Sequence, residues 1–251
     1  MSVADQTASF EDALTSVADV EGWMTDAQAR RLWDAARRVG RAGRVVEIGS
    51  FRGRSTIILG RAVAPGVEIV AIDPHGGSDR GPNEYDPDLE LGDSDHDIFH
   101  ANLGRAGVAE RVRHVRRTSA GALTEVTGPI ELLYIDGAHR YRFAKPDIAR
   151  WGPRVSAGGS LLIHDSYNAV GVMLAQLRLL FLSREFRYVG RSGSLAEYRR
   201  ESLSPRGRAD NALAQAASLP YFLRNCVVKL ALVARLRPLA RLLGEHGHWP
   251  Y

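Results

Sequence analysis

The segment Ile130–Tyr141 begins as an apolar run and then places three reactive side chains close together. Asp136, His139 and Tyr141 supply a carboxylate, an imidazole and a phenol. A carboxylate can bind a cation or a hydroxyl group, and an imidazole with an ordinary pKa of about 6.5 can accept a proton near neutral pH. This spacing indicates a reaction site at the end of a buried strand.

Carboxylates also stand at the ends of other strand-like runs. Glu47 lies within RVVEIGS, Asp73 ends VEIVAID, and Asp165 ends GGSLLIHD. In open α/β sheets, ligands bind beyond the carboxyl ends of the strands. We therefore expect these three carboxylates and Asp136 to share one crevice.

The elements that must position these residues alternate between strand-like and helical runs. The strand-like runs cover 44–50, 67–73, 111–117, 130–136 and 158–165. Parallel strands need crossovers, which are usually helices. The runs 185–191 and 194–200, joined by Ser192 and Gly193, predict a hairpin. The fold class is therefore α/β, with a Rossmann-like, doubly wound sheet of seven mostly parallel strands and an antiparallel edge hairpin.

The predicted organisation has three parts. A helical cap covers 1–43, where Thr25 and Gln28 form a capping box, and the sheet domain covers 44–201. Helical runs are expected at 95–107 and 119–126 within that domain. The segment 75–97 is polar and turn-rich, which predicts either a substrate-binding lid or a solvated insert.

The third part, 202–251, is predicted to be a basic amphipathic helical extension. It interleaves leucine, valine and alanine with arginines and one lysine, and a proline at position 238 would kink it. Packing against a second subunit, which would make a homodimer, is the favoured interpretation. Docking on an anionic membrane surface is the alternative.

Composition narrows the classes of protein. The chain has 251 residues, is 45% hydrophobic and has a net charge of +4, which is ordinary for a soluble α/β domain. A single cysteine, Cys226, excludes an internal disulfide and suits a reducing compartment. We expect a cytoplasmic protein, because neither a signal peptide nor a long uninterrupted apolar run is evident. Arginine is spread along the chain, which argues against a nucleic-acid partner.

The first strand end predicts the ligand. Gly49 and Gly53 allow a close approach to the backbone, and Ser55 stands at a helix start with free amides. Glu47 would repel a pyrophosphate and favour a ligand that carries an ammonium and a sulfonium. Asp73 is suitably placed to bind the hydroxyls of a ribose. Together they indicate S-adenosylmethionine, although an ordinary turn with Asp73 as a loop cap is the alternative.

Four segments resemble the class I S-adenosylmethionine-dependent methyltransferases in order and spacing. They are VVEIGSFRGRST, IVAIDPHG, ELLYIDGAHRY and GGSLLIHDSY. The D-G-x-H-x-Y and G-G…H-D-x-Y elements are similar to the macrocin O-methyltransferase-like sugar O-methyltransferases. The resemblance covers about residues 22–200. It implies methyl transfer to a hydroxyl of a small-molecule or oligosaccharide acceptor, such as a deoxysugar of a natural product or a mannoside of a methylated polysaccharide.

The resemblance also implies roles for individual residues. Asp73 would hold the ribose, Ser119 the adenine and Asp136 part of the cofactor, and the surroundings of the methionine moiety would be Glu47, Gly49, Ser50, Gly53 and Ser55. Asp136 and Asp165 would bind a divalent metal, usually Mg²⁺. Several relatives have two adjacent acids at the second position, whereas Asp165 here lies between His164 and Ser166. This departure implies a weaker metal site, and a capping role is the alternative for Asp165.

Methyl transfer to a sugar hydroxyl needs a base, because that hydroxyl is a weak acid. His139 is the expected general base, with Asp136 beside it, and Mg²⁺ would assist. The alternative for His139 is a helix-start histidine bonded to nearby backbone. Tyr141 and Tyr167 either line the pocket or pack. His164 is expected to point to the opposite side of its strand from Asp165.

The sequence is compatible with three other functions. They are a catechol-type O-methyltransferase, a metal-dependent hydroxylase of the same fold, and a cofactor-binding module without enzymatic activity. Methylation of a nucleic-acid base is disfavoured, because DGAH occupies the place after the fourth strand where a segment for a flipped base would stand.

Overall fold

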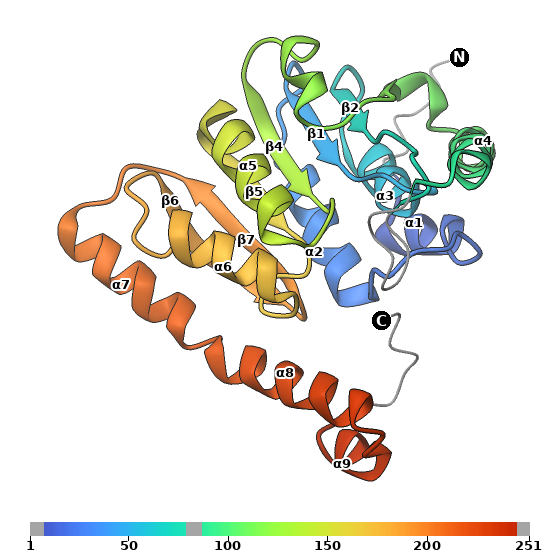
Figure 1. Ribbon diagram of the computed structural model, residues 1–251. Coiled ribbons are helices and arrows are strands. Elements are labelled where there is room, and N and C mark those ends of the chain that lie inside the picture. The colour runs from blue at the N-terminus through green and yellow to red at the C-terminus, as the bar shows by residue number, and fades with distance from the viewer. Residues whose placement is uncertain (1–7, 79–86, 245–251) are drawn as a thin grey trace.

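A computed structural model of the chain describes residues 8–78 and 87–244, and seven strands form one sheet (Figure 1). The strands are β1 (Arg44–Ile48), β2 (Glu68–Ile72), β3 (Val112–Val115), β4 (Ile130–Ile135), β5 (Val155–Ile163), β6 (Phe186–Ser192) and β7 (Leu195–Arg200). Their order is β3-β2-β1-β4-β5-β7-β6. The first five are parallel, and β7 runs antiparallel to both β5 and β6. The predicted fold class is confirmed.

Helices cover both faces of the sheet because strand side chains alternate between two apolar cores. Val45 belongs to one core and Val46 to the other. The first core includes side chains from α1 (Phe10–Ser16), α2 (Asp26–Ala36), α3 (Arg54–Ala62) and α4 (Leu89–Arg105). The second includes side chains from α5 (Tyr141–Trp151) and α6 (Val170–Leu179).

The predicted capping box at the start of α2 is confirmed. Thr25 accepts a hydrogen bond from Gln28 N, and Gln28 Oε1 accepts one from Thr25 N at 2.8 Å. The amide nitrogen of Gln28 also donates to Ser194 Oγ at 3.0 Å. The Gln28 side chain thereby caps the start of α2 and also binds the β6–β7 turn.

Two local predictions are wrong. Helix α4 begins at Leu89, six residues before the predicted start, because Asp88 caps it by accepting from Leu91 N at 3.0 Å. The predicted loop 75–97 is therefore partly helical, and its residues 79–86 lie outside the described residues. The run 119–126 contains only a short 3₁₀ turn, η3 (Gly121–Thr124), because the Thr118 hydroxyl accepts from Gly121 N and favours a tight turn. Two further 3₁₀ turns are η2 (Ala109–Arg111) and η4 (Gly152–Arg154).

The C-terminal helices form an arm that starts beside the hairpin (Figure 1). They are α7 (Pro205–Ala216), α8 (Leu219–Val233) and α9 (Arg237–Leu242). Asn211 of α7 accepts from Tyr188 N at 2.6 Å, which joins α7 to β6. From α8, Asn225 donates to Tyr167 O at 3.1 Å and Lys229 to Asn168 O at 2.9 Å. The arm thus reaches the loop that follows β5.

The run Pro205–Val233 is long and apolar enough to cross a membrane by length and composition alone. Its most apolar window has a mean hydropathy of 1.3 and is 22% buried. Charged residues such as Arg208, Asp210 and Arg224 interrupt this segment, so it does not meet the requirement for a long uninterrupted apolar run. The division at 43/44 and 201/202 stays a prediction.

A glycine at the end of β1 allows three strand ends to converge. Gly49 has φ of 85°, and a Cβ atom there would lie 2.2 Å from Asp136 O. Gly49 N donates to Ile72 O at 2.9 Å, and Asp136 N donates to Ile48 O at 2.8 Å. The ends of β1, β2 and β4 are therefore held together by backbone contacts that leave no room for a side chain.

Replacing this glycine has a predictable cost. Gly49→Ala should lower the free energy of unfolding by about 2 kcal/mol or more, because the left-handed backbone and the clash with Asp136 both oppose a Cβ atom. Gly104→Ala in α4 is the matched control, since a Cβ atom there meets nothing within 4 Å. It should raise the stability by up to about 1 kcal/mol through helix propensity. Urea denaturation measures both, and equal midpoints for the two variants would contradict the assignment.

Candidate active site

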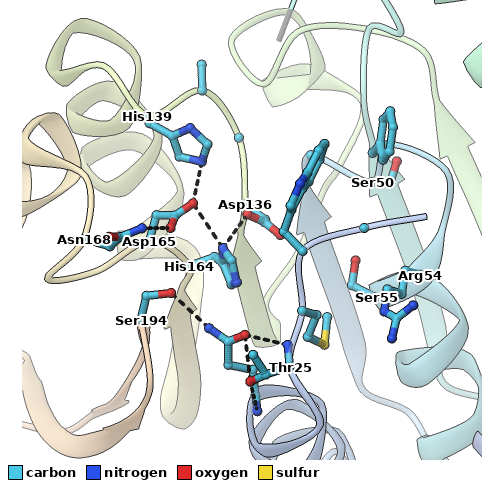
Figure 2. A pocket seen from close by; sticks show the side chains of 18 of the residues that line it. Thr25, Ser50, Arg54, Ser55, Asp136, His139, His164, Asp165, Asn168 and Ser194 are labelled. Carbon is cyan, nitrogen blue, oxygen red and sulfur yellow. Dashed lines mark hydrogen bonds and ion pairs between the residues drawn. The ribbon is translucent and has the colours of Figure 1, made fainter. Parts of the chain in front are cut away.

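A cavity of about 440 Å³ opens at the carboxyl ends of the parallel strands (Figure 2). This volume is in the range of small-molecule sites. The predicted site residues that line it are Gly49, Ser50, Ser55, Asp73, Asp136, His139 and Asp165. The structure therefore brings together most of the residues that the strand-end argument selected.

Asp73 organises the turn between β1 and α3. Its Oδ2 accepts from the backbone N–H groups of Ser50 and Phe51, both at 2.9 Å, and its Oδ1 accepts from His75 N at 2.8 Å. Phe51 and His75 both have left-handed backbones, with φ of 45° and 44°. The hydroxyl of Ser50 is buried and has no hydrogen-bond partner among the described residues. The turn thus presents an unsatisfied polar atom beside an anchored carboxylate.

Glu47 lies behind this turn and is absent from the cavity lining. It is fully buried, and the hydroxyls of Ser55 and Thr56 donate to its two oxygens. Burial raises the pKa of Glu47 to about 8, although both hydrogen bonds oppose the shift. Near neutral pH the protonated form is therefore favoured, and the expected repulsion of a pyrophosphate by Glu47 is weaker than a full charge would give.

Two other predicted contacts also lie away from the cavity lining. Gly53 is the left-handed N-cap of α3, with φ of 88°, and packs near Phe99. Ser119 donates a hydrogen bond to Asp147, and burial raises the pKa of Asp147 to about 6. The adenine role of Ser119 stays a prediction, as does the methionine role of Gly53.

Four charged or titratable side chains form a continuous chain at the ends of β4 and β5 (Figure 2). His139 Nε2 lies 2.7 Å from Asp165 Oδ2. His164 Nδ1 lies 3.3 Å from the same oxygen and 3.1 Å from Asp136 Oδ1. We call Asp136, His139, His164 and Asp165 the ion cluster.

The ion cluster balances a buried carboxylate, Asp165, and a half-buried one, Asp136, with two imidazoles. Burial alone would lower the pKa of His164, but the charges of Asp136 and Asp165 outweigh it and raise that pKa well above its ordinary value. The same opposition raises the pKa of His139, with the hydrogen bond to Asp165 as the main favourable contribution. Burial would raise the pKa of Asp165, but the charge of His164 and the hydrogen bond from His139 hold it well below the usual range.

The predicted orientation of His164 is wrong. His164 and Asp165 were expected on opposite sides of the strand, yet their side chains face each other. Strand β5 ends at Ile163, and Asp165 has a left-handed backbone with φ of 50°. Alternation of side chains holds only inside a strand, so the turn brings both residues to the cavity.

A divalent metal fits three members of the ion cluster. Asp136, His139 and Asp165 each offer a ligand atom, and these atoms lie within 4.8 Å of one another. Two carboxylates and an imidazole suit several divalent ions, although Mg²⁺ favours an all-oxygen shell. The sequence selected both aspartates as ligands and His139 as a base, whereas the structure makes His139 a possible third ligand.

Several neighbours that orient the ion cluster were not predicted. Tyr134 donates to Asp136 Oδ2 at 2.7 Å, and Asn168 donates to Asp165 Oδ1 at 2.8 Å. Tyr134 lies inside the apolar run of β4, so only its two-residue spacing from Asp136 could have indicated this bond. Gly171 was also missed; a Cβ atom there would lie 2.3 Å from His139 O.

Both ends of the described chain contribute cavity walls. Trp23 precedes α2 and stacks on Phe51 with ring centroids 5.4 Å apart, and Tyr221, Arg224 and Asn225 come from α8. Nothing in the local sequence of α8 indicates that it faces the strand ends. Tyr141 and Tyr167, which were considered as lining residues, belong instead to the exposed start of α5 and to the buried core.

Comparisons with known proteins agree with this fold. Residues 46–166 match a family model described as a methyltransferase domain. A catechol O-methyltransferase of Mycobacterium tuberculosis is 31% identical over 136 residues, which are 54% of this chain and 53% of that protein. The alignment thus spans about half the length of this relative.

Solved structures add the likeness in fold. Cofactor-bound Rv0187 from MTB has a TM-score of 0.54 at 21% identity, covering 77% of this chain and 89% of that chain. An O-methyltransferase from Bacillus cereus in complex with SAH has a TM-score of 0.51 at 16% identity, covering 78% and 91%. The likeness to these structures shows a shared Rossmann-like fold, as the motifs predicted, and the match to a methyltransferase domain spans residues 46–166, just under half of the chain. These matches do not single out the macrocin-like subfamily.

The raised pKa of Glu47 makes stability depend on pH. The folded state holds a proton that the unfolded state releases above its ordinary pKa of 4.5, so this contribution is lost as the pH rises from about 4.5 to 8. Glu47→Gln lacks the titrating group. Its melting temperature relative to the unmodified protein should therefore rise across that window and level off above pH 8.

The exposed Glu110→Gln serves as the control, because its side chain is solvated in both states. Thermal denaturation from pH 5 to 9 measures all three proteins. Parallel pH profiles for Glu47→Gln and the unmodified protein would contradict the buried, protonated state.

Proposed function

We propose that this protein is an S-adenosylmethionine-dependent O-methyltransferase that acts on a small hydroxylated acceptor. The observation that carries the proposal is the ion cluster beside the β1–α3 turn, because it joins a proton acceptor to a cofactor-type crevice. The match of residues 46–166 to a methyltransferase domain supports the same class of reaction.

The cofactor side of the cavity supports S-adenosylmethionine as the methyl donor. Asp73 lines the cavity at the end of β2, where a ribose would lie, and the buried hydroxyl of Ser50 lacks a partner among the described residues. The cofactor-bound state of the Bacillus cereus relative, which holds SAH, is consistent with this assignment.

His139 is the proposed general base. In the reaction, the acceptor oxygen would form a bond to the methyl carbon as the carbon–sulfur bond breaks, and the hydroxyl proton would pass to His139. Asp165 orients the imidazole through the 2.7 Å contact and favours its protonated form. A divalent ion held by Asp136 and Asp165 would supply Lewis acidity that lowers the pKa of the acceptor hydroxyl.

The proposed acceptor is a sugar hydroxyl. The cavity wall from the β6–β7 turn and α8 carries hydroxyl, guanidinium and amide groups, contributed by Ser194, Arg224 and Asn225. Such groups suit a ligand rich in hydroxyls. A catechol is the second candidate, and it is favoured by the similarity to the catechol O-methyltransferase of Mycobacterium tuberculosis and by the aromatic rings of Trp23 and Tyr221 in the lining.

An acceptor screen tests this function. Isotope-labelled S-adenosylmethionine is incubated with the protein and with panels of sugars and catechols, and mass spectrometry identifies the products. A methylated sugar is expected, with turnover lost in EDTA and restored by Mg²⁺. Methylation of catechols alone would transfer the proposal to that class. Products heavier by one oxygen atom would instead indicate a hydroxylase, and binding of the donor without any product would leave only a binding module.

His139→Ala tests the base directly. The variant should reduce kcat by about 100-fold or more, while the affinity for S-adenosylmethionine in calorimetry stays unchanged. Activity of the unmodified protein should fall as the pH drops through the raised pKa of His139, because protonation removes the base. This acidic limb should be absent from the residual activity of the variant.

Tyr141→Phe is the control, since Tyr141 stands two residues along and is absent from the cavity lining. Its kcat should equal that of the unmodified protein. An unchanged pH profile in His139→Ala would exclude His139 as the base, and a rise in the Mg²⁺ concentration needed for activity would instead indicate a ligand.

A further inference from the structure

Three histidines from two elements converge outside the ion cluster. His96 and His100 lie on α4, and His114 lies on β3. The ring centroids are 4.6 Å apart for His96 and His100, and each of these rings is 5.3 Å from that of His114. One possible ligand atom from each residue lies within 4.8 Å of the other two. We call these residues the histidine triad.

Local geometry explains how the triad forms. Positions four apart on a helix lie on the same face, so His96 and His100 project side by side from α4. Strand β3 pairs in parallel with β2, and His114 stands opposite Ala71 in that register. The helix thus presents two rings and the sheet edge presents the third.

The rings are held in the manner of metal ligands. The Nε2 atom of His114 is buried and has no hydrogen-bond partner among the described residues. His96 Nδ1 lies 3.5 Å from a carboxylate oxygen of Asp97. In metal sites, a ligating histidine usually turns one ring nitrogen to a carbonyl or carboxylate and the other to the ion.

Charge also suits a metal. Burial lowers the pKa of His114 to about 4, and the neighbouring His75, His100 and His96 add to the shift. Burial and the nearby His96 and His75 lower the pKa of His100 as well. Neutral imidazole is the form that binds metals, so little proton release would oppose binding near neutral pH.

We propose that His96, His100 and His114 form a binding site for a late divalent transition metal, best matched by Zn²⁺. Three imidazoles favour zinc, nickel or copper over the oxygen-preferring Mg²⁺ and Ca²⁺. The side chain of His100 is exposed, which lets water complete the shell. This site is separate from the carboxylate-containing group of Asp136, His139 and Asp165.

The position of the triad gives the ion a structural consequence. It would link α4 to β3 directly beside Asp73, the proposed ribose ligand. His75 packs against the triad, with its ring centroid 5.0 Å from that of His114, and its Nε2 bonds to Phe51 O at 2.8 Å. Zn²⁺ would therefore stabilise the same strand-end region that the cofactor is proposed to use.

Zinc titration of the full chain tests the proposal. The protein is prepared without a histidine tag, stripped with EDTA and titrated with Zn²⁺ against a chromophoric chelator. One high-affinity site is expected at the triad, distinct from weaker binding at Asp136, His139 and Asp165, and His96→Ala and His100→Ala should each weaken the high-affinity binding by about tenfold or more. Zn²⁺ should raise the melting temperature of the unmodified protein but not that of the His96→Ala/His100→Ala double variant.

Two controls assign the site. His139→Ala removes a ligand from the other possible metal group and should keep the full zinc affinity. The double variant His246→Ala/His248→Ala, which changes two histidines distant in sequence from the triad, should keep it too. Because His100 is exposed, His100→Ala should retain the native circular dichroism spectrum. No zinc binding by the unmodified protein, unchanged affinity in His100→Ala, or loss of binding in either control would overturn the proposal.

Discussion

The site depends on sharp turns that the chain makes at the carboxyl ends of its parallel strands. After β1, β2 and β5 the backbone enters the left-handed region at Gly49, Phe51, His75, Asp165 and Tyr167. Such conformations cost about 1 to 3 kcal/mol for a residue other than glycine, and they persist only where surrounding contacts enforce them. Asp73 supplies three of those contacts by accepting from Ser50, Phe51 and His75. The turns aim side chains into the cavity that straight strands would direct elsewhere.

Much of the fold followed from local patterns. Alternation of apolar runs predicted the order of strands and helices, and the Thr25–Gln28 capping box needed only residues within one turn. The errors arose where local rules stop. The orientation of His164 depended on a turn beyond β5, where strand alternation no longer applies. The start of α4 differs in kind, because its cap at Asp88 is a local signal inside a polar run that was predicted to be a loop.

Some residues of the candidate site could likewise be predicted from local patterns, and others could not. Asp136, His139 and Asp165 were predicted because strand ends meet at one edge of a sheet. The contributions of α8 could not be predicted, because Asn225 contacts the loop after β5, which is far away in the sequence. The histidine triad has a local signal in the spacing of His96 and His100, but its third member requires the pairing of β3 with β2.

The cavity is lined by residues inside and outside the segment that matches the methyltransferase family model. The segment matched by the methyltransferase family model, 46–166, contains Gly49, Asp73 and the whole ion cluster. The cavity wall from the β6–β7 turn and α8 is made by residues that follow this segment in the sequence. The cavity lining is therefore divided between the matched segment and residues outside it.

The tie between Gln28 and Ser194 also bears on how the molecule opens. The same side chain caps α2 through Oε1 and holds the β6–β7 turn through Nε2, so the start of the helix and the turn are linked through one residue. Arg31 and Arg38 strengthen this connection by pairing with the buried Glu197 of β7. Helix α2 of the N-terminal helical part and the edge hairpin are therefore expected to open as one unit, with backbone amides that exchange hydrogen together.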